Sequence, residues 1–179
     1  TGESEYCEVF FDEAVADADH VVGTVGDGWN VAMATLGFER GTGAMAMLVS
    51  FEREFEGLID LARSVGSSTD PVLRDAIVRS WIELRLLRAT LDRSLPSIIA
   101  GTPGPEASVS KLAWSSWYQR FGELAMDVQG VASLVSDATP GEPDTPGRTR
   151  LDNIQRAFLF GRAVTIYAEI GRASCRERV

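Results

Sequence analysis

Apolar residues recur at steps of three and four along four segments of the chain, and this spacing constrains the fold more than any other feature. Such spacing places side chains on one face of an α-helix, so each segment is predicted to be an amphipathic helix. The first helix is expected to begin near Trp29. The residues expected to face inward are Leu48, Phe51, Phe55, Leu58, Ala62 and Val65 in the first helix, Ala76, Ile77, Trp81, Leu84, Leu87 and Leu91 in the second, Val109, Leu112, Trp117, Phe121, Leu124 and Val128 in the third, and Leu151, Ile154, Phe158 and Ile166 in the fourth.

Turn-forming residues separate these helices. After "GSSTDP", Asp70 is a suitable N-cap and Pro71 a suitable first helical residue, and the second helix is expected to end near Leu95. "GTPGPE" (101–106) breaks the chain again, and the Pro-, Gly- and Asp-rich stretch 136–147 is expected to be an exposed excursion. The sequence therefore predicts an all-α fold, an antiparallel up-down-up-down four-helix bundle.

The stretch before the first helix has a different composition. "YCEVFFDE" (6–13) is rich in β-branched and aromatic residues, and "GTVGDG" (23–28) is a cluster of turn residues. These features predict a short strand followed by a loop that leads into the bundle.

Composition narrows the class of protein. The chain has 179 residues and a formal net charge of −9, which argues against nucleic acid or an anionic membrane surface as a partner. Its length indicates about one domain. All but one of the seventeen basic residues are arginine, which suggests a GC-rich bacterial genome.

The last nine residues, "GRASCRERV" (171–179), match the translation of a common short-read sequencing adapter. The adapter bases just upstream, in the same frame, also encode Ile170 and most of Glu169. We therefore expect residues 169–179 to be a non-native scar on a piece of a longer protein, the alternative being a genuine basic tail. Since Cys175 lies in this tail, Cys7 is the only credible cysteine, which is consistent with a reducing cytoplasm.

One pair of residues stands out as candidate chemistry. The apolar stretch "GWNVAMATLGFER" (28–40) carries no charge until it ends in Glu39 and Arg40. From the residues alone, a half-buried structural ion pair is the commoner explanation. A carboxylate among apolar residues can, however, have a raised pKa, which suits a general base near neutral pH.

Three stretches, in the same order along the chain, resemble the acyl-CoA dehydrogenase family. "EVFFDEAVADADHVVGTVGDGWNVAMATLGFERG" is similar to that family's passage from its middle β-domain into the first helix of its C-terminal bundle. "PGPEASVSKLAWSSWYQRFGELAMDVQG" resembles the third bundle helix, and "RAFLFGRAVTIYA" resembles the last helix and the start of the "TIYAGTSEIQR" loop. The resemblance implies the end of a middle β-domain and its linker at 1–27, and a C-terminal four-helix bundle at 28–168.

The resemblance also implies a reaction and a set of residues. Family members use FAD to oxidise an acyl-CoA to a trans-2-enoyl-CoA, with a glutamate that removes the α-proton. That glutamate lies either in the terminal loop, which falls here on Ala168, or on the first bundle helix, which falls here on Glu39. Because Ala168 has no carboxylate, the resemblance assigns the base to Glu39. It makes Arg40 a structural partner near the substrate, Tyr167 a pocket residue, and the Ala168 amide a donor to the thioester carbonyl.

Departures from the family pattern concern the contacts between subunits. Asp17 stands where a proline is usual, and the second helix lacks the "RxxFGxxxxxFQ" pattern that meets a neighbouring flavin. The adenine-side "QxxGG" pattern is reduced to Asp127 and Gly130.

The resemblance implies a dimer or tetramer, as a homo- or hetero-oligomer, with electron-transfer flavoprotein as acceptor. Two alternatives are a non-catalytic assembly subunit of a heteromeric dehydrogenase, and a flavin oxidase or monooxygenase on the same fold.

Overall fold

The computed structural model describes residues 8–100, 104, 106–134 and 154–166, and within them it does not describe the side chains at 36–44, 106–108 and 156. Four α-helices make up most of this part: α1 (Gly28–Ser64), α2 (Pro71–Ile99), α3 (Glu106–Gln129) and α4 (Ile154–Val164). Three 3-10 turns accompany them, η1 (Ala18–His20), η2 (Ser67–Thr69) and η3 (Gly130–Leu134).

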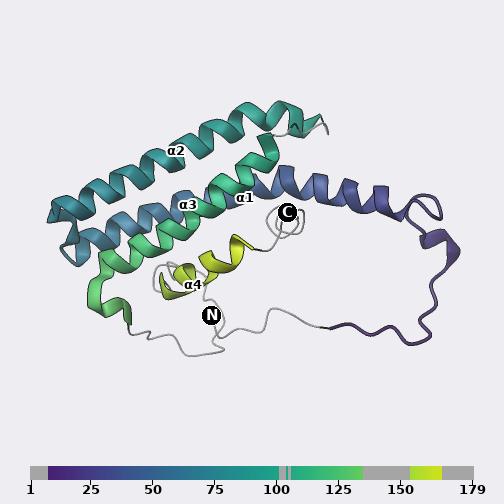
Figure 1. Ribbon diagram of the computed structural model, residues 1–179, viewed down its shortest axis with the longest axis horizontal. Helices are drawn as coiled ribbons and strands as arrows, with labels where there is room; N and C mark the ends of the chain where they lie inside the picture. The colour runs from purple at the N-terminus through teal and green to yellow at the C-terminus, as the bar shows by residue number, and fades with distance from the viewer. Residues whose placement is uncertain (1–7, 101–103, 105, 135–153, 167–179) are drawn as a thin grey trace, which may run out of the picture.

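Successive helices run in opposite directions, as Figure 1 shows, so the predicted antiparallel bundle is confirmed. Helix α3 lies at its centre, since it packs against α1, α2 and α4. Helix α1 has 37 residues and α4 only 11, so the helices are of very unequal length. At a rise of about 1.5 Å per residue, α1 is on the order of 55 Å long and extends beyond its neighbours.

The turn between α1 and α2 has the predicted chemistry. Gly66 has a φ of 81°, a left-handed conformation that glycine adopts without steric cost. The Oδ1 atom of Asp70 accepts hydrogen bonds from the backbone N–H groups of Val72 (2.8 Å) and Leu73 (3.3 Å), with Pro71 as the first helical residue. The N-cap at Asp70 is therefore confirmed.

The end of α2 differs from the prediction. The helix continues through Pro96 and ends at Ile99, although proline cannot donate to the carbonyl four residues earlier. The backbone N–H of Ala100 closes the last turn on the Pro96 carbonyl (3.0 Å), and Ile98 packs against the core. Packing of Ile98 accounts for the four extra residues that the local signal did not predict.

The expected strand at 6–13 is not found in the described part of the chain. Residues 8–13 form no strand, and Val9, Phe10 and Phe11 are exposed; Tyr6 and Cys7 lie outside the described residues. A strand requires hydrogen bonds to a neighbouring strand. No strand occurs among residues 8–100, 106–134 and 154–166, so this apolar stretch has no sheet to join.

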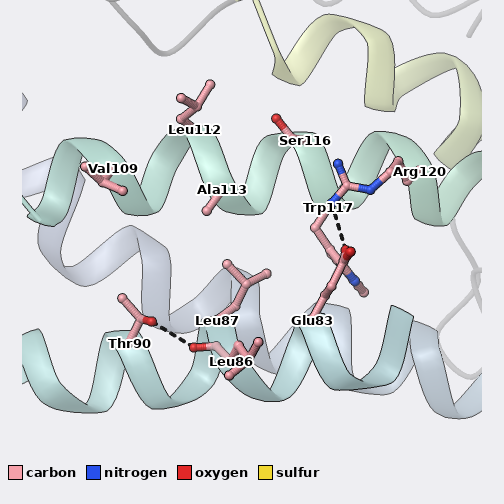
Figure 2. Close-up of a pocket in the computed structure, with 10 residues that line it drawn as sticks. All are labelled: Glu83, Leu86, Leu87, Thr90, Val109, Leu112, Ala113, Ser116, Trp117 and Arg120. Carbon is pink, nitrogen blue, oxygen red and sulfur yellow. Dashed lines mark hydrogen bonds and ion pairs between the residues drawn. The ribbon is translucent and has the colours of Figure 1, made fainter. Parts of the chain in front are cut away.

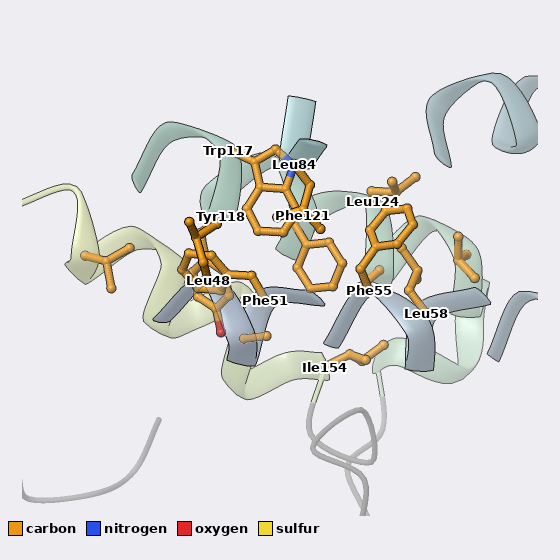
Figure 3. Close-up of a cluster of buried hydrophobic side chains, with 14 of the residues drawn as sticks. Leu48, Phe51, Phe55, Leu58, Leu84, Trp117, Tyr118, Phe121, Leu124 and Ile154 are labelled. Carbon is orange, nitrogen blue, oxygen red and sulfur yellow. The ribbon is translucent and has the colours of Figure 1, made fainter. Parts of the chain in front are cut away.

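Aromatic residues of α1 and α3 fill the middle of the core (Figure 3). The ring of Trp117 lies 5.2 Å from that of Phe51 and 5.1 Å from that of Phe121, measured between centroids. The buried hydrophobic residues are Leu48, Phe51, Phe55, Leu58, Ala62, Leu84, Leu91, Trp117, Tyr118, Phe121, Leu124, Ala125, Val128, Ile154, Ala157 and Val164. Most of the predicted inward residues are thus confirmed.

Some predicted inward residues are instead exposed: Val65, Trp81, Val109, Leu112 and Ile166. Trp81 lies in a groove between α1 and α2, and Val109 and Leu112 lie along a groove between α2 and α3. Periodicity assigns a residue to the apolar face of its own helix, but the neighbouring helices do not cover that whole face. Leu151 lies outside the described residues.

Helices α3 and α4 approach closely through two glycines. A methyl group on Gly122 would lie 2.8 Å from the Cα atom of Phe158, and one on Gly161 would lie 3.3 Å from the Cα atom of Gln119. Each glycine therefore lets the backbone of one helix lie against the backbone of the other.

Candidate active site

Glu39 and Arg40 lie in the first half of α1, as the sequence predicted, in helical backbone. Their side chains fall outside what the structure describes. The start of this helix is held by Asp27, whose carbonyl accepts from the N–H groups of Asn30 and Val31, and whose carboxylate accepts from the Asn30 side chain.

The first half of α1 projects beyond the other described helices (Figure 1). Trp29 at its start is 72% exposed, and the residues from 28 to 35 are exposed apart from partial burial of Val31 and Met33. By contrast, the second half of α1 buries Leu48, Phe51, Phe55 and Leu58 against the bundle. The start of α1, residues 28–35, is therefore largely exposed, whereas its second half packs into the core of the bundle.

The end of α4 is the second element of the candidate site. The Nζ atom of Lys111 on α3 donates a 2.8 Å hydrogen bond to the backbone carbonyl of Val164, the last residue of α4. The N–H of Ile166 then closes a turn on the carbonyl of Ala163 (2.8 Å). Tyr167 and Ala168 follow directly in the sequence and lie outside the described residues.

These two elements lie toward the same end of the bundle. Helix α1 begins there and α4 ends there, because the helices alternate in direction (Figure 1). The start of α1 and the end of α4 therefore lie toward the same end of the described bundle.

Gly130 is the described residue that the sequence associated with a cofactor. It begins η3 at the end of α3, is exposed, and has a φ of 66°. A methyl group built on it would meet nothing within 4 Å. Its backbone is therefore open to a group from another domain or subunit, whereas Asp127 one turn earlier is an exposed carboxylate.

A groove of about 380 Å³ lies between α2 and α3 (Figure 2). Its walls are mainly apolar, and its polar end is closed by an ion pair between Glu83 and Arg120, with 2.7 Å between Oε2 and an arginine Nη. The residues that line it are Glu83, Leu86, Leu87, Thr90, Val109, Leu112, Ala113, Ser116, Trp117 and Arg120.

A second groove, between α1 and α2, is lined largely by paired charges. Arg88 lies 3.3 Å from an oxygen of Glu52 and 3.1 Å from one of Asp92. The hydrogen bond and charge of Asp92, and then the charge of Glu52, raise the pKa of Arg88 above its ordinary value. Because arginine is already protonated at neutral pH, this shift leaves the charge of Arg88 unchanged there.

A metal site and a membrane-spanning helix would each require particular features of the described residues. Within 8–100, 106–134 and 154–166, no three His, Cys, Asp or Glu side chains come together as a metal site would require. In the same part of the chain, none of the helices combines the length and the apolar character needed to cross a bilayer.

Sequence reasoning missed Lys111, the single lysine of the chain. It is only 8% exposed, although charged residues are rarely buried without a partner. The available signal was a lysine three residues before Trp114, and the contact of this lysine with α4 became visible only in the structure.

The chain matches the family model described as "Acyl-CoA dehydrogenase, C-terminal domain" over residues 26–171. It belongs to the acyl-CoA dehydrogenase family. Its helical bundle is consistent with the all-α C-terminal domain that the match identifies. The resemblance found in the sequence is thereby confirmed.

Two curated relatives are 43% identical to the chain over 182 aligned positions: acyl-CoA dehydrogenase IpdE1 of Mycolicibacterium smegmatis and of Mycobacterium tuberculosis. Both alignments cover 100% of this chain, and 43% and 44% of the respective relatives. Acyl-CoA dehydrogenase FadE34 of Mycobacterium tuberculosis is 33% identical over 139 residues, which cover 76% of this chain and 19% of that protein. The chain thus spans less than half the length of these relatives. No solved structure matches the chain significantly.

Proposed function

We propose that this chain is the C-terminal part of an FAD-dependent enzyme that oxidises an acyl-CoA to a trans-2-enoyl-CoA, with Glu39 as the base that removes the α-proton. The observation that carries the proposal is the arrangement of the bundle. The chain belongs to the acyl-CoA dehydrogenase family. Helix α1, which contains Glu39, begins toward the same end of the bundle at which α4 ends.

The exposure of residues 28–35 at the start of α1 supports this assignment. A catalytic base must meet the substrate outside the packed core, and the helix that contains Glu39 extends beyond the other described helices at this end. In the proposed reaction, the Glu39 carboxylate takes the α-proton and the substrate gains a Cα=Cβ double bond.

We assign the binding and orientation of the thioester to three residues near Glu39 and the end of α4. The backbone N–H of Ala168 would donate to the thioester carbonyl and so stabilise negative charge that develops as the α-proton leaves. Tyr167 would line the acyl pocket, and Arg40 would be a structural partner near that pocket. Together these groups bind and orient the thioester while Glu39 holds the proton.

FAD would accept the hydride that leaves the β-carbon. Gly130 fits a contact with this cofactor, because its backbone is exposed and no atom would lie within 4 Å of a side chain there. We assign the remaining flavin contacts to parts of the protein that the chain does not span and to a neighbouring subunit.

Assembly and electron transfer complete the proposal. Helix α2 exposes Val78, Ile82 and Leu86, apolar residues of the kind that subunit interfaces cover. We therefore propose a homo- or hetero-oligomer, with electron-transfer flavoprotein as acceptor, in the cytoplasm of a bacterium.

The test replaces Glu39 by glutamine in the complete enzyme. The amide keeps the size of the side chain but cannot take the proton, so we expect kcat to fall by about 10²–10⁴-fold with little change in acyl-CoA binding. Exchange of the α-proton of a non-oxidisable acyl-CoA analogue with D₂O, followed by NMR, measures proton removal apart from hydride transfer. This exchange should also be lost.

Glu56→Gln is the matched control, because Glu56 is an exposed carboxylate on the same helix. It should leave both turnover and exchange near the wild-type values. Near-normal turnover in Glu39→Gln would end the assignment of the base. Absence of acyl-CoA oxidation in the complete wild-type protein would favour the assembly subunit or the other flavin chemistry instead.

A further inference from the structure

Lys111 is a buried lysine of α3 that contacts both the end of α4 and an aromatic ring. Its side chain is buried, and its Nζ atom donates to the backbone carbonyl of Val164 at 2.8 Å. The same Nζ atom lies 4.7 Å from the centre of the Trp114 ring, close enough for a cation–π contact.

The ammonium group of Lys111 lies at the C-terminal end of α4. Val164 is the last residue of the helix, where backbone carbonyls lack partners within the helix and the helix dipole is negative. A cation is favoured at this position, and a buried cation interacts more strongly than an exposed one because water screens it less. Lys111 therefore fixes the place where the chain leaves α4.

The contacts of Lys111 continue to α1 through aromatic side chains. Trp114 lies below the ammonium group, and its ring centroid is 5.9 Å from that of Phe51 on α1. Phe51 is 5% exposed and also stacks on Tyr118 at 4.8 Å. The end of α4 is thus connected by direct contacts, through α3, to the helix that carries Glu39.

We infer that Lys111 is a positioning residue for the proposed reaction, which holds the end of α4 so that the Ala168 amide meets the thioester while Glu39 reaches the α-carbon. Ala168 follows Val164 by four residues, so a shift of the Val164 carbonyl displaces the start of that segment. The inference rests on the proposed function. It assigns to Lys111, on α3, a role that acts through the backbone of α4.

The experiment compares Lys111→Met, Lys111→Arg and wild type in the complete, flavin-loaded enzyme. Methionine keeps much of the length and apolar packing of lysine but removes the donor. We expect kcat and the D₂O exchange of the α-proton to fall by at least about 10-fold, since small misplacement of reacting groups can cost up to about 100-fold. The KM for the acyl-CoA should change by less than about threefold. A merely structural lysine would lower thermal stability without this separation of kcat from KM.

Lys111→Arg keeps a cation that can reach the carbonyl and should retain kcat within about threefold of wild type. The matched control is Arg120→Met, which removes an exposed cation of α3 that pairs with α2 rather than α4. It should leave kcat, KM and exchange unchanged.

Three results would overturn the inference: a folded Lys111→Met enzyme with wild-type kcat, a folded Lys111→Arg enzyme as impaired as the methionine variant, or failure of both variants to fold. Glu39→Gln separates these outcomes from failure of the proposed function. If that variant loses exchange while Lys111→Met retains it, only the positioning role is wrong. If Glu39→Gln retains exchange, the proposed base itself is wrong.

Discussion

The crossing of α3 and α4 predicts that Gly122→Ala destabilises the bundle. A methyl group at this position would lie 2.8 Å from the Cα atom of Phe158 and 3.2 Å from the backbone oxygen of Ala157. These are backbone atoms, so no side-chain rotation can relieve the contact, and α4 as a whole must move.

Two opposing effects set the magnitude. Alanine in place of glycine favours a helix by up to about 1 kcal/mol, whereas overpacking a tight core costs about 1–3 kcal/mol. Because the contact is with backbone, we take the upper part of this range and expect a net loss of about 1–2 kcal/mol. In a domain of this size that corresponds to a decrease in Tm of roughly 3–6 °C.

The assay is urea and thermal unfolding of the chain, followed by circular dichroism. Gly161→Ala, where the contact is 3.3 Å, should be less destabilising than Gly122→Ala. The control is Gly28→Ala at the start of α1, where a methyl group meets nothing within 4 Å and stability should change by less than about 0.5 kcal/mol. If Gly122→Ala is as stable as Gly28→Ala, the close approach of the two backbones is refuted.

Two further predictions concern the proposed chemistry. In the complete enzyme, Glu39→Gly combined with Ala168→Glu should recover part of the turnover that Glu39→Gly loses, because both positions would serve one pocket. The test is turnover measured across a range of pH. No recovery at any pH would count against the shared pocket. Residues 1–168 expressed alone should give a helical circular dichroism spectrum, self-associate in sedimentation through exposed apolar residues such as Ile82 and Leu86, and bind no FAD in a titration. A yellow, monodisperse monomer that an acyl-CoA reduces would contradict that expectation.

Local signals predicted the helices of the described chain. Asp70 and Pro71 mark the start of α2 because an N-cap and a first-turn proline satisfy the helix terminus within a few residues. The stripe from Leu48 to Ala62 was predicted correctly because α1 buries that whole face between α2 and α3. The family, too, could be recognised from the sequence, since its motifs are runs of neighbouring residues.

The exposure of the other apolar residues depended on how the neighbouring helices cover them. Trp81 and Leu112 lie on the apolar faces of their own helices, yet each is about half exposed because a groove lies beside it. The residues at 8–13 have strand-forming composition, but a strand is formed only with a partner, and the described chain supplies none.

For the candidate site, too, some residues could be predicted from the sequence and others were found only in the tertiary structure. From the sequence, the family resemblance made Glu39 the candidate base, because Ala168 has no carboxylate, and this assignment stays a prediction. The position of Glu39 in the first bundle helix was also predicted from the sequence. Only the tertiary structure showed that Lys111 holds the end of α4 and that Gly122 sets the spacing of the two helices. The physical reason is range: a cap or an apolar stripe acts between residues a few positions apart, whereas Lys111 and Val164 are 53 positions apart and meet only after the bundle has packed.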